Sequence, residues 1–262
     1  MLVTGATGFL GRHLMIASER NGWELVAPSS AIMNVLGRER TISEIREWRP
    51  NVVVHLAYKR NDRRTIVEGT SNVAEGAQAA RAHLVHVSTD MVFRGRPITY
   101  SESDHPSPID NYGRWKVESE QIAASIVPSA LIIRPSMLYG TDRLAKCQTD
   151  VEAVCEGRST MAFFKDEIRC AAFAGDVASA ISTLASHTHL SGPIHVGGPP
   201  ISRADLACHV ADWLGYDGYS IPLTTLAESG QTRPGVLMLD TRLAESHDAG
   251  CRPIQEVLRL RH

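Results

Sequence analysis

The chain has 262 residues, of which 43% are hydrophobic and 21% charged, and its formal net charge is −2 at pH 7. These values are those of a globular protein with a substantial core. They give no electrostatic reason to expect nucleic acid or an anionic membrane as a partner. No apolar run is long enough to span a bilayer. The N-terminus lacks a basic segment followed by an apolar one, and the five cysteines form no CxxC pair, so we expect reduced thiols and a cytoplasmic protein.

Strand and helix patterns alternate from residue 1 to about residue 135. The VVVHLA run within 51–57 is nearly continuous in apolar residues, which is typical of strands in a buried parallel sheet. The alternation predicts an α/β fold with a doubly wound parallel sheet, the Rossmann fold. The predicted strands are 1–4, 23–27, 51–57, 84–88 and 130–134, and the predicted helices are one after the first strand and 41–48, 71–82 and 112–126.

Beyond Gly140 the pattern becomes less regular. A strand passing into a helix is predicted over 171–185, and a short strand over 193–196. We therefore expect a dinucleotide-binding Rossmann domain and a smaller C-terminal substrate-binding lobe. The first is assigned residues 1–140 and 168–197, and the second residues 141–167 and 198–262.

Three glycines follow the first predicted strand and precede the first predicted helix. Gly5, Gly8 and Gly11 lie in the segment TGATGFLG. Glycines allow a sharp turn and a close approach of the backbone to a pyrophosphate, and a helix N-terminus presents free N–H groups to that anion. In this strand–turn–helix context the motif predicts a dinucleotide site.

The second predicted strand indicates which dinucleotide is bound. The acidic residue that would hold an NAD ribose hydroxyl is missing, and the strand ends in Pro28, Ser29 and Ser30. Neutral hydroxyl groups tolerate a 2′-phosphate, and Arg12 or Arg38 could neutralise it. The sequence therefore favours NADP(H) over NAD(H).

Tyr112 and Lys116 are four residues apart at the start of a predicted helix and therefore share one of its faces. The preceding strand ends close to Thr89. A phenol has a reference pKa near 10, and a nearby ammonium group would lower it. Thr89 could hold a carbonyl oxygen and Tyr112 could protonate it while a nicotinamide supplies hydride.

Four segments carry a resemblance to a known family: TGATGFLG, STDMVF (88–93), YGRWK (112–116) and RPSMLYG (134–140). In this order they resemble the extended short-chain dehydrogenases/reductases, most closely the dTDP-4-dehydrorhamnose reductase group that acts on nucleotide sugars. The likeness continues through DEIR to GDVA (166–178) and RPGVLMLD (233–240) and covers essentially the whole chain.

The resemblance implies a role for each matching residue. Thr89, Tyr112 and Lys116 would be catalytic. The cofactor would contact Gly5, Thr7, Gly8, Phe9, Leu10, Gly11, Ser29, Asn34, Val35, Leu56, Ala57, Tyr58, Val87, Tyr112, Lys116 and Pro135. The substrate would contact Thr89, Asp90, Met91, Met137, Arg169 and Arg233.

The two arginines match residues that clasp a substrate diphosphate in related enzymes, and an ordinary ion pair is the alternative for each. Met91 and Met137 stand where the rhamnose-pathway reductases carry tyrosine and tryptophan. Because both aromatic residues would stack on the sugar or the base, these departures concern which molecule is reduced.

The predicted function is NAD(P)H-dependent reduction of a keto group on a nucleotide-linked sugar, with a tyrosine as proton donor. Two alternatives remain open. One is a sugar-nucleotide epimerase or another carbonyl reductase, and the other is a non-catalytic NADP-binding regulatory subunit like that of methionine adenosyltransferase. The resemblance also implies a homodimer, and no spacing of histidines or carboxylates predicts a metal site.

Overall fold

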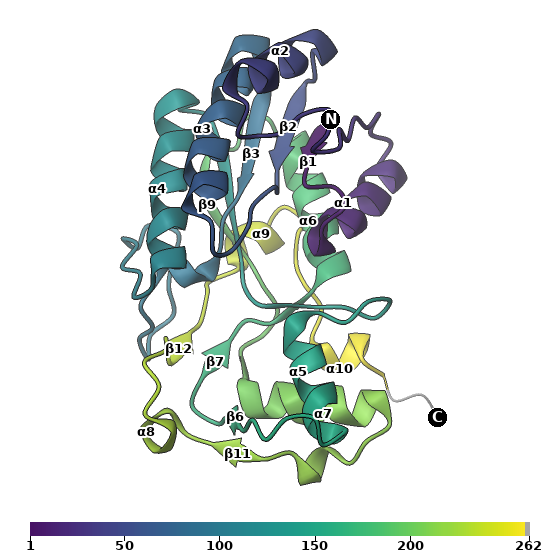
Figure 1. Cartoon of the computed structure of the whole chain (residues 1–262), viewed down its shortest axis with the longest axis vertical. Helices are drawn as coiled ribbons and strands as arrows, with labels where there is room; N and C mark the ends of the chain where they lie inside the picture. The colour runs from purple at the N-terminus through teal and green to yellow at the C-terminus, as the bar shows by residue number, and fades with distance from the viewer. Residues whose placement is uncertain (260–262) are drawn as a thin grey trace.

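A five-stranded parallel sheet forms the centre of the chain (Figure 1). The computed structural model describes residues 1–259. Neighbouring strands pair in the order β1-β2-β3-β4-β9. The strands are β1 (Leu2–Thr4), β2 (Val52–His55), β3 (His83–Val87), β4 (Leu131–Pro135) and β9 (Gly192–Val196). The α/β architecture predicted from the sequence, with a parallel sheet, is confirmed.

Helices cover both faces of this sheet. On one face α1 packs on α6, and on the other α2 packs on α3, which packs on α4. β2 explains why both faces are covered: Val52 and Val54 belong to one apolar cluster, whereas Val53 belongs to the other. The helices are α1 (Phe9–Arg20), α2 (Arg38–Trp48), α3 (Arg63–Ala80), α4 (Asn111–Ile126) and α6 (Ala174–Ser186).

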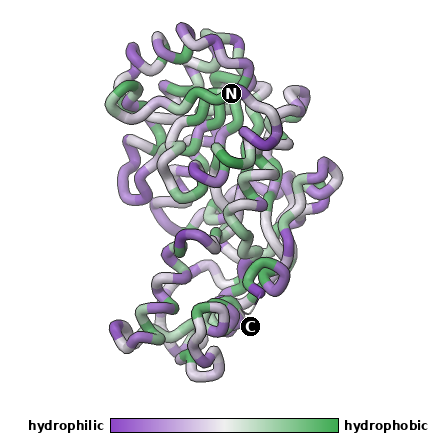
Figure 2. The backbone as a smooth tube through the Cα atoms, turned by 90° about the vertical axis from the view of Figure 1, so that its right-hand side faces the viewer, coloured by the Kyte–Doolittle hydropathy of each residue, from purple (hydrophilic) through white to green (hydrophobic). Residues whose placement is uncertain are grey.

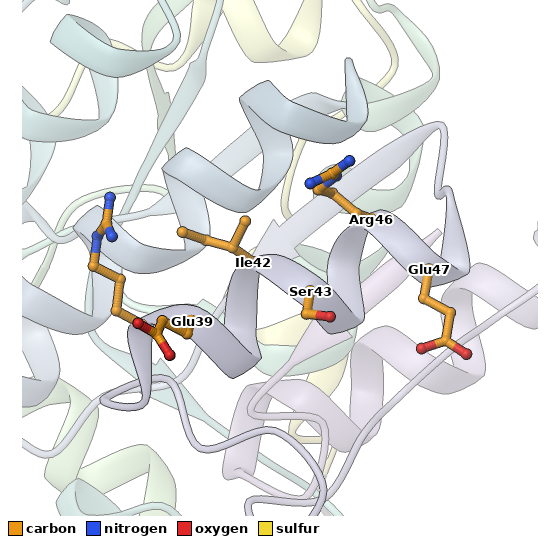
Figure 3. A pocket seen from close by; sticks show the side chains of 6 residues that line it. Glu39, Ile42, Ser43, Arg46 and Glu47 are labelled. Carbon is orange, nitrogen blue, oxygen red and sulfur yellow. The ribbon is translucent and has the colours of Figure 1, made fainter.

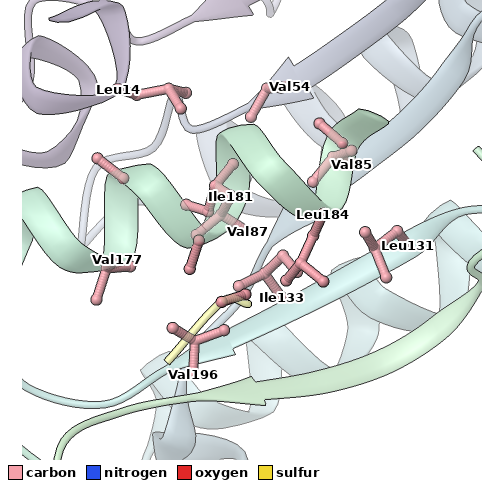
Figure 4. Close-up of a cluster of buried hydrophobic side chains, with 14 of the residues drawn as sticks. Leu14, Val54, Val85, Val87, Leu131, Ile133, Val177, Ile181, Leu184 and Val196 are labelled. Carbon is pink, nitrogen blue, oxygen red and sulfur yellow. The ribbon is translucent and has the colours of Figure 1, made fainter. Parts of the chain in front are cut away.

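The largest apolar cluster lies between α6 and the sheet (Figure 4). Ile181 and Leu184 of α6 are fully buried against Val85 and Ile133 of the strands. Burying a side chain of this size contributes roughly 1.5–3 kcal/mol. In Figure 2 the hydrophobic stretches concentrate inside the part of the molecule that holds the sheet, and hydrophilic stretches lie mainly around it.

The sheet order reverses at β1. Leu2 pairs with Val53 of β2 on one side and with Val26 in an isolated bridge on the other. The chain therefore leaves β1 toward one edge and returns on the opposite side. In open α/β sheets ligands bind beyond the carboxyl ends of the strands at such a reversal.

A smaller set of elements lies below the sheet in Figure 1. Its strands form one three-stranded and two two-stranded sheets. These strands are β5 (Leu138–Tyr139), β6 (Phe163–Phe164), β7 (Ile168–Arg169), β8 (Ala172–Phe173), β10 (Ile201–Ser202), β11 (Leu223–Thr224) and β12 (Val236–Leu237). The helices are α5 (Lys146–Cys155), α7 (Arg203–Leu214), α8 (Leu226–Ser229) and α10 (Ile254–Val257), with the 3₁₀ turn η2 (Gly218–Ser220). The helix α9 (Arg242–Glu245) packs on β9 instead, and the 3₁₀ turn η1 (Asp90–Val92) packs on α4.

The domain bounds given above stay a prediction. Strand β7 pairs with β10 and β12 and not with the central sheet, although residues 168–169 were assigned to the Rossmann part. The end of the predicted lobe, residues 260–262, lies outside the described residues.

Two predicted elements differ from the structure. The strand predicted over 23–27 is reduced to the single bridge of Val26, because β1 has only three residues with which to pair. The helix predicted over 71–82 begins earlier, at Arg63, where the Asp62 side chain accepts a hydrogen bond from the Arg64 N–H and caps the first turn.

No helix within residues 1–259 is both long and apolar enough to cross a membrane.

Candidate functional site

The glycine turn between β1 and α1 has the geometry of an anion cradle. Gly5 has φ of +74°, and a Cβ there would lie 2.8 Å from the Ala57 nitrogen. A Cβ on Gly11 would lie 2.2 Å from the Gly5 carbonyl oxygen, so neither position accepts a side chain. Among residues 1–259 no side chain caps α1, and its first turn holds no acidic residue. The first-turn N–H groups beside Thr7 and Gly8 are therefore suited to a pyrophosphate.

The strand ends beside this turn are fixed by one hydroxyl group. Thr4, the last residue of β1, accepts hydrogen bonds at Oγ1 from the Leu56 N–H at 3.2 Å and the Ala57 N–H at 3.3 Å. Val87 and Pro135 are the last residues of β3 and β4. Leu56, Ala57, Val87 and Pro135, which were predicted to contact the cofactor, therefore lie along one edge of the sheet.

The loop before α2 is anchored through its backbone. The Asn72 amide donates to the Val35 carbonyl oxygen at 2.7 Å, and the Thr41 hydroxyl donates to the Asn34 carbonyl oxygen at 3.0 Å. Ser29, like Asn34, is exposed. This leaves the predicted adenosine side of the site open to solvent.

The two arginines considered for a 2′-phosphate differ in their surroundings. Arg38 forms an ion pair of 2.5 Å with Glu75 of α3. Arg12 is exposed, and its Nε donates to the Thr7 carbonyl oxygen at 3.2 Å, which places it against the glycine turn. Arg12 is therefore the better placed of the two.

The predicted catalytic residues come together at the carboxyl end of β3. Tyr112 and Lys116 lie on α4, one turn apart, and Thr89 lies near enough to the Tyr112 hydroxyl to act on its pKa. The Asp110 side chain caps α4 by accepting from the Gly113 N–H at 2.7 Å, which fixes the start of the helix. Thr89, Tyr112 and Lys116 are 8%, 8% and 3% exposed.

The ionisation of this site differs from the expectation. Burial raises the pKa of Tyr112 well above its usual range, and Tyr58 adds to this rise, whereas Arg60 and Thr89 oppose it. Lys116 lies one helical turn beyond Tyr112 on α4. Its ammonium donates to the Val87 carbonyl oxygen at 2.8 Å, and burial lowers its own pKa to about 8.

The loop after β2 contributes two further groups. The Tyr58 ring lies 6.0 Å from the Tyr112 ring and 5.0 Å from the Lys116 ammonium. The Arg60 guanidinium lies 4.3 Å from the centre of the Tyr112 ring. Tyr58 was predicted as a cofactor residue, whereas the sequence reasoning missed Arg60. The signal for it was a cation just after a buried parallel strand, at the edge where ligands bind.

Asp90, which follows Thr89, is 1% exposed and paired within the protein. Its carboxylate accepts from Arg169 Nε at 3.0 Å, from Arg169 Nη2 at 2.6 Å and from the Ser136 hydroxyl at 2.7 Å. For Arg169 the structure therefore shows the ion pair that was the alternative reading, buried rather than on the surface. A substrate contact for Asp90 and Arg169 stays a prediction.

Glu167 extends this pair into a chain of charges. It is fully buried, lies 3.5 Å from Arg169 Nη1, and accepts from Arg233 Nε at 2.8 Å. The resulting chain, Asp90–Arg169–Glu167–Arg233, connects the end of β3 to β7 and to the segment before β12. Glu167 was missed by the sequence reasoning, although it lies in the DEIR segment.

The two predicted substrate methionines are partly buried. Met91 packs against the cluster that contains Tyr112, whereas Met137 packs against the apolar cluster around α5 and α7. Met91 thus adjoins the predicted catalytic tyrosine, and Met137 lies toward the smaller set of elements.

Two surface pockets lie away from these side chains. One follows the exposed face of α2, where Glu39, Ser43 and Glu47 project from the helix (Figure 3). The other lies between β10, α7 and α10. Neither contains a residue predicted for the substrate or catalysis, and Arg38, considered above for a 2′-phosphate, lines the first. Within residues 1–259 no group of three or more histidine, cysteine or acidic side chains is arranged to hold a metal ion.

Known proteins are similar to this chain in sequence or in structure. Methionine adenosyltransferase 2 subunit beta of Rattus norvegicus is 28% identical in an alignment of length 289, which covers 96% of this chain and 83% of the relative. dTDP-4-dehydrorhamnose reductase of Aggregatibacter actinomycetemcomitans is 29% identical over 230 residues, and this match covers 81% of this chain and 78% of the relative.

Among solved structures, dTDP-4-dehydrorhamnose reductase from Bacillus anthracis in complex with NADP superposes with a TM-score of 0.85. It is 24% identical, and the match covers 98% of this chain and 96% of that one. The family model described as RmlD substrate binding domain matches residues 1–256. The chain therefore belongs to the RmlD substrate binding domain family.

Proposed function

We propose that this chain is an NADP(H)-dependent reductase that converts a keto group of a nucleotide-linked sugar into an alcohol. The observation that carries the proposal is the proximity of Thr89 to the Tyr112 hydroxyl, one helical turn from Lys116 and at the sheet edge that holds the glycine turn. The relationship to dTDP-4-dehydrorhamnose reductases supports the same chemistry.

Each residue has a defined role in this proposal. The glycine turn and the N-terminus of α1 bind the pyrophosphate of the cofactor, which supplies hydride to the carbonyl carbon. Thr89 holds the carbonyl oxygen, and Tyr112 donates its phenolic proton to that oxygen as the C–O double bond becomes a single bond. Lys116 provides a buried positive charge that stabilises the phenolate left behind.

Turnover tests the proposal directly. The protein is incubated with NADPH and a panel of 4-keto nucleotide sugars, and the absorbance of NADPH is followed. Oxidation of NADPH with at least one member of the panel is the expected result. Tight NADPH binding without oxidation by any member would contradict a reductase.

We expect Arg12→Gln to weaken NADPH binding roughly tenfold or more and to leave NADH binding nearly unchanged. Arg12 lies against the glycine turn, and no carboxylate within residues 1–259 pairs with it, so its charge is available to the 2′-phosphate. Fluorescence titration with each cofactor measures the two affinities. Arg38→Gln is the matched control, since Arg38 is paired with Glu75. Equal weakening for NADPH and NADH in Arg12→Gln would contradict the assignment.

The activity of the protein should decline as the pH rises above about 8. Burial lowers the pKa of Lys116 to about 8, with Glu120 opposing the shift, so the ammonium is charged below this pH and neutral above it. Loss of that charge should reduce kcat/KM for NADPH by about tenfold for each further pH unit. Lys116→Arg keeps its charge and should lack this decline. A wild-type profile that stays flat between pH 7 and 10 would contradict the role of Lys116.

A second candidate is a non-catalytic, NADP-binding regulatory subunit. It is favoured by the similarity to methionine adenosyltransferase 2 subunit beta over 96% of this chain. A regulatory subunit would bind NADPH, oxidise none with any carbonyl compound, and co-elute with a methionine adenosyltransferase catalytic subunit on size-exclusion chromatography. An epimerase, the remaining alternative, would convert its nucleotide sugar without net NADPH consumption. The eluted mass also tests the proposed homodimer.

A further inference from the structure

Arg203 is the first residue of α7 and forms no ion pair with any carboxylate of residues 1–259. Its side chain is partly buried, and its Nη1 donates to the sulfur of Met137. Its Nε is buried and finds no hydrogen-bond acceptor among residues 1–259. No carboxylate within the same part of the chain lies at ion-pair distance from the guanidinium.

The pairing of the neighbouring charges explains why Arg203 lacks a carboxylate partner among them. Asp90 is taken up by Arg169, and Glu167 is shared between Arg169 and Arg233. Three guanidinium groups therefore stand against two carboxylates, which leaves one positive charge uncompensated. Burial lowers the pKa of Arg203, and Arg169 and Arg233 lower it further, while Glu167 opposes them.

A buried guanidinium without an anion is costly, because it loses hydration without gaining a partner. At a predicted ligand site, such a group is suited to bind an anionic ligand. The planar fork of a guanidinium matches the oxygens of a phosphate or carboxylate, both of which accept two parallel hydrogen bonds.

The location connects this charge to the substrate. Arg203 contacts Met137, which directly follows Ser136, and the Ser136 hydroxyl donates to Asp90 at the predicted catalytic edge. We propose that Arg203 binds an oxyanion of the substrate, either the diphosphate of a nucleotide or a carboxylate on its sugar. This inference rests on the proposed function, because it takes the substrate to be a nucleotide-linked sugar.

Binding of four probes tests the inference without any need for turnover. Isothermal titration calorimetry in the presence of NADPH measures UDP, dTDP, UDP-glucose and UDP-glucuronate. Arg203→Met replaces the charge with an apolar chain beside Met137, Arg203→Lys keeps the charge without the fork, and Arg114→Gln is an exposed control on α4. Arg203→Met is expected to lose about tenfold or more in affinity, and Arg203→Lys less.

The pattern across the probes identifies the oxyanion. An equal loss for all four assigns Arg203 to the diphosphate. A loss confined to UDP-glucuronate, with UDP-glucose unchanged, assigns it to a sugar carboxylate. Unchanged affinity of Arg203→Met for every probe overturns the inference, as does a wild type that binds none of them.

Thermal unfolding supplies an independent readout. Without nucleotide, Arg203→Met should unfold at the same temperature as the wild type or higher, because an unpaired buried charge is removed. The probe that binds should then stabilise the wild type more than it stabilises Arg203→Met. A lower unfolding temperature of Arg203→Met without nucleotide would identify Arg203 as a structural residue and overturn the inference. Retained NADPH oxidation in that case would leave the proposed reductase function standing.

Discussion

Replacing Tyr112 with phenylalanine should reduce kcat for carbonyl reduction by about a hundredfold to ten-thousandfold and leave NADPH binding unchanged. The phenylalanine ring keeps the packing of Tyr112 against Ile66 and Val67. The substitution removes the hydroxyl group, the only part of the side chain that can deliver a proton to the carbonyl oxygen. The rise in the pKa of Tyr112 caused by burial keeps this hydroxyl protonated at neutral pH, which suits a proton donor.

Stopped-flow or steady-state measurement of NADPH oxidation, combined with a fluorescence titration of NADPH, separates the two effects. Tyr139→Phe is a matched control. Tyr139 is also fully buried, and its hydroxyl has no hydrogen-bond partner among residues 1–259, so its removal should change neither turnover nor fold. If Tyr112→Phe retained turnover within a few-fold of the wild type, the proton would have to come from another group, and the proposed mechanism would be wrong.

The central sheet and its helices were predictable because their signals are local. The VVVHLA run alternates between the two apolar clusters, and four of its residues form β2. The helix over 112–126 was predicted to within one residue. The start of α3 was missed because Asp62 caps the helix inside a charged stretch, NDRRT, which lacks an apolar repeat.

The candidate site likewise has a part that local sequence patterns predicted and a part that they did not. The glycine turn and the Tyr112–Lys116 spacing are local patterns, and the structure brings both to one edge of the sheet. The pairing of Asp90 with Arg169 spans 79 residues of sequence, and nothing in either segment indicates it. For Arg60 the sequence indicates only a place after a buried strand, because the direction of an exposed side chain in a loop does not follow from any periodicity.

The pairing of Asp90 with Arg169 should make a large contribution to stability. Replacing Asp90 with alanine should lower the free energy of unfolding by about 3–5 kcal/mol, because the buried Arg169 guanidinium loses its main partner. Glu167 compensates only in part, since it lies 3.5 Å from Arg169 and also holds Arg233. Urea denaturation of the whole chain, followed by tryptophan fluorescence, measures the change.

Two matched variants separate the buried pair from charge in general. Glu68→Ala breaks the exposed pair between Arg64 and Glu68 and should cost less than about 1 kcal/mol. The double variant Asp90→Ala with Arg169→Met removes both buried charges and should recover much of the lost stability. If Asp90→Ala were no more costly than Glu68→Ala, the pair would contribute nothing to the fold.

Substituting Asp90 should also slow the proposed reaction. The Thr89 hydroxyl donates to Asp90 Oδ1 at 3.3 Å, and Thr89 lies near the Tyr112 hydroxyl, so the carboxylate helps to orient the hydroxyl that is proposed to hold the carbonyl oxygen. Asp90→Asn keeps the shape of the side chain, and below its unfolding temperature it should reduce kcat more than KM. An Asp90→Asn protein that is destabilised but turns over at the wild-type rate would restrict Asp90 to a structural role. Because the pair joins the end of β3 to β7, such a result would also separate the stability of this junction from the reactivity of Thr89.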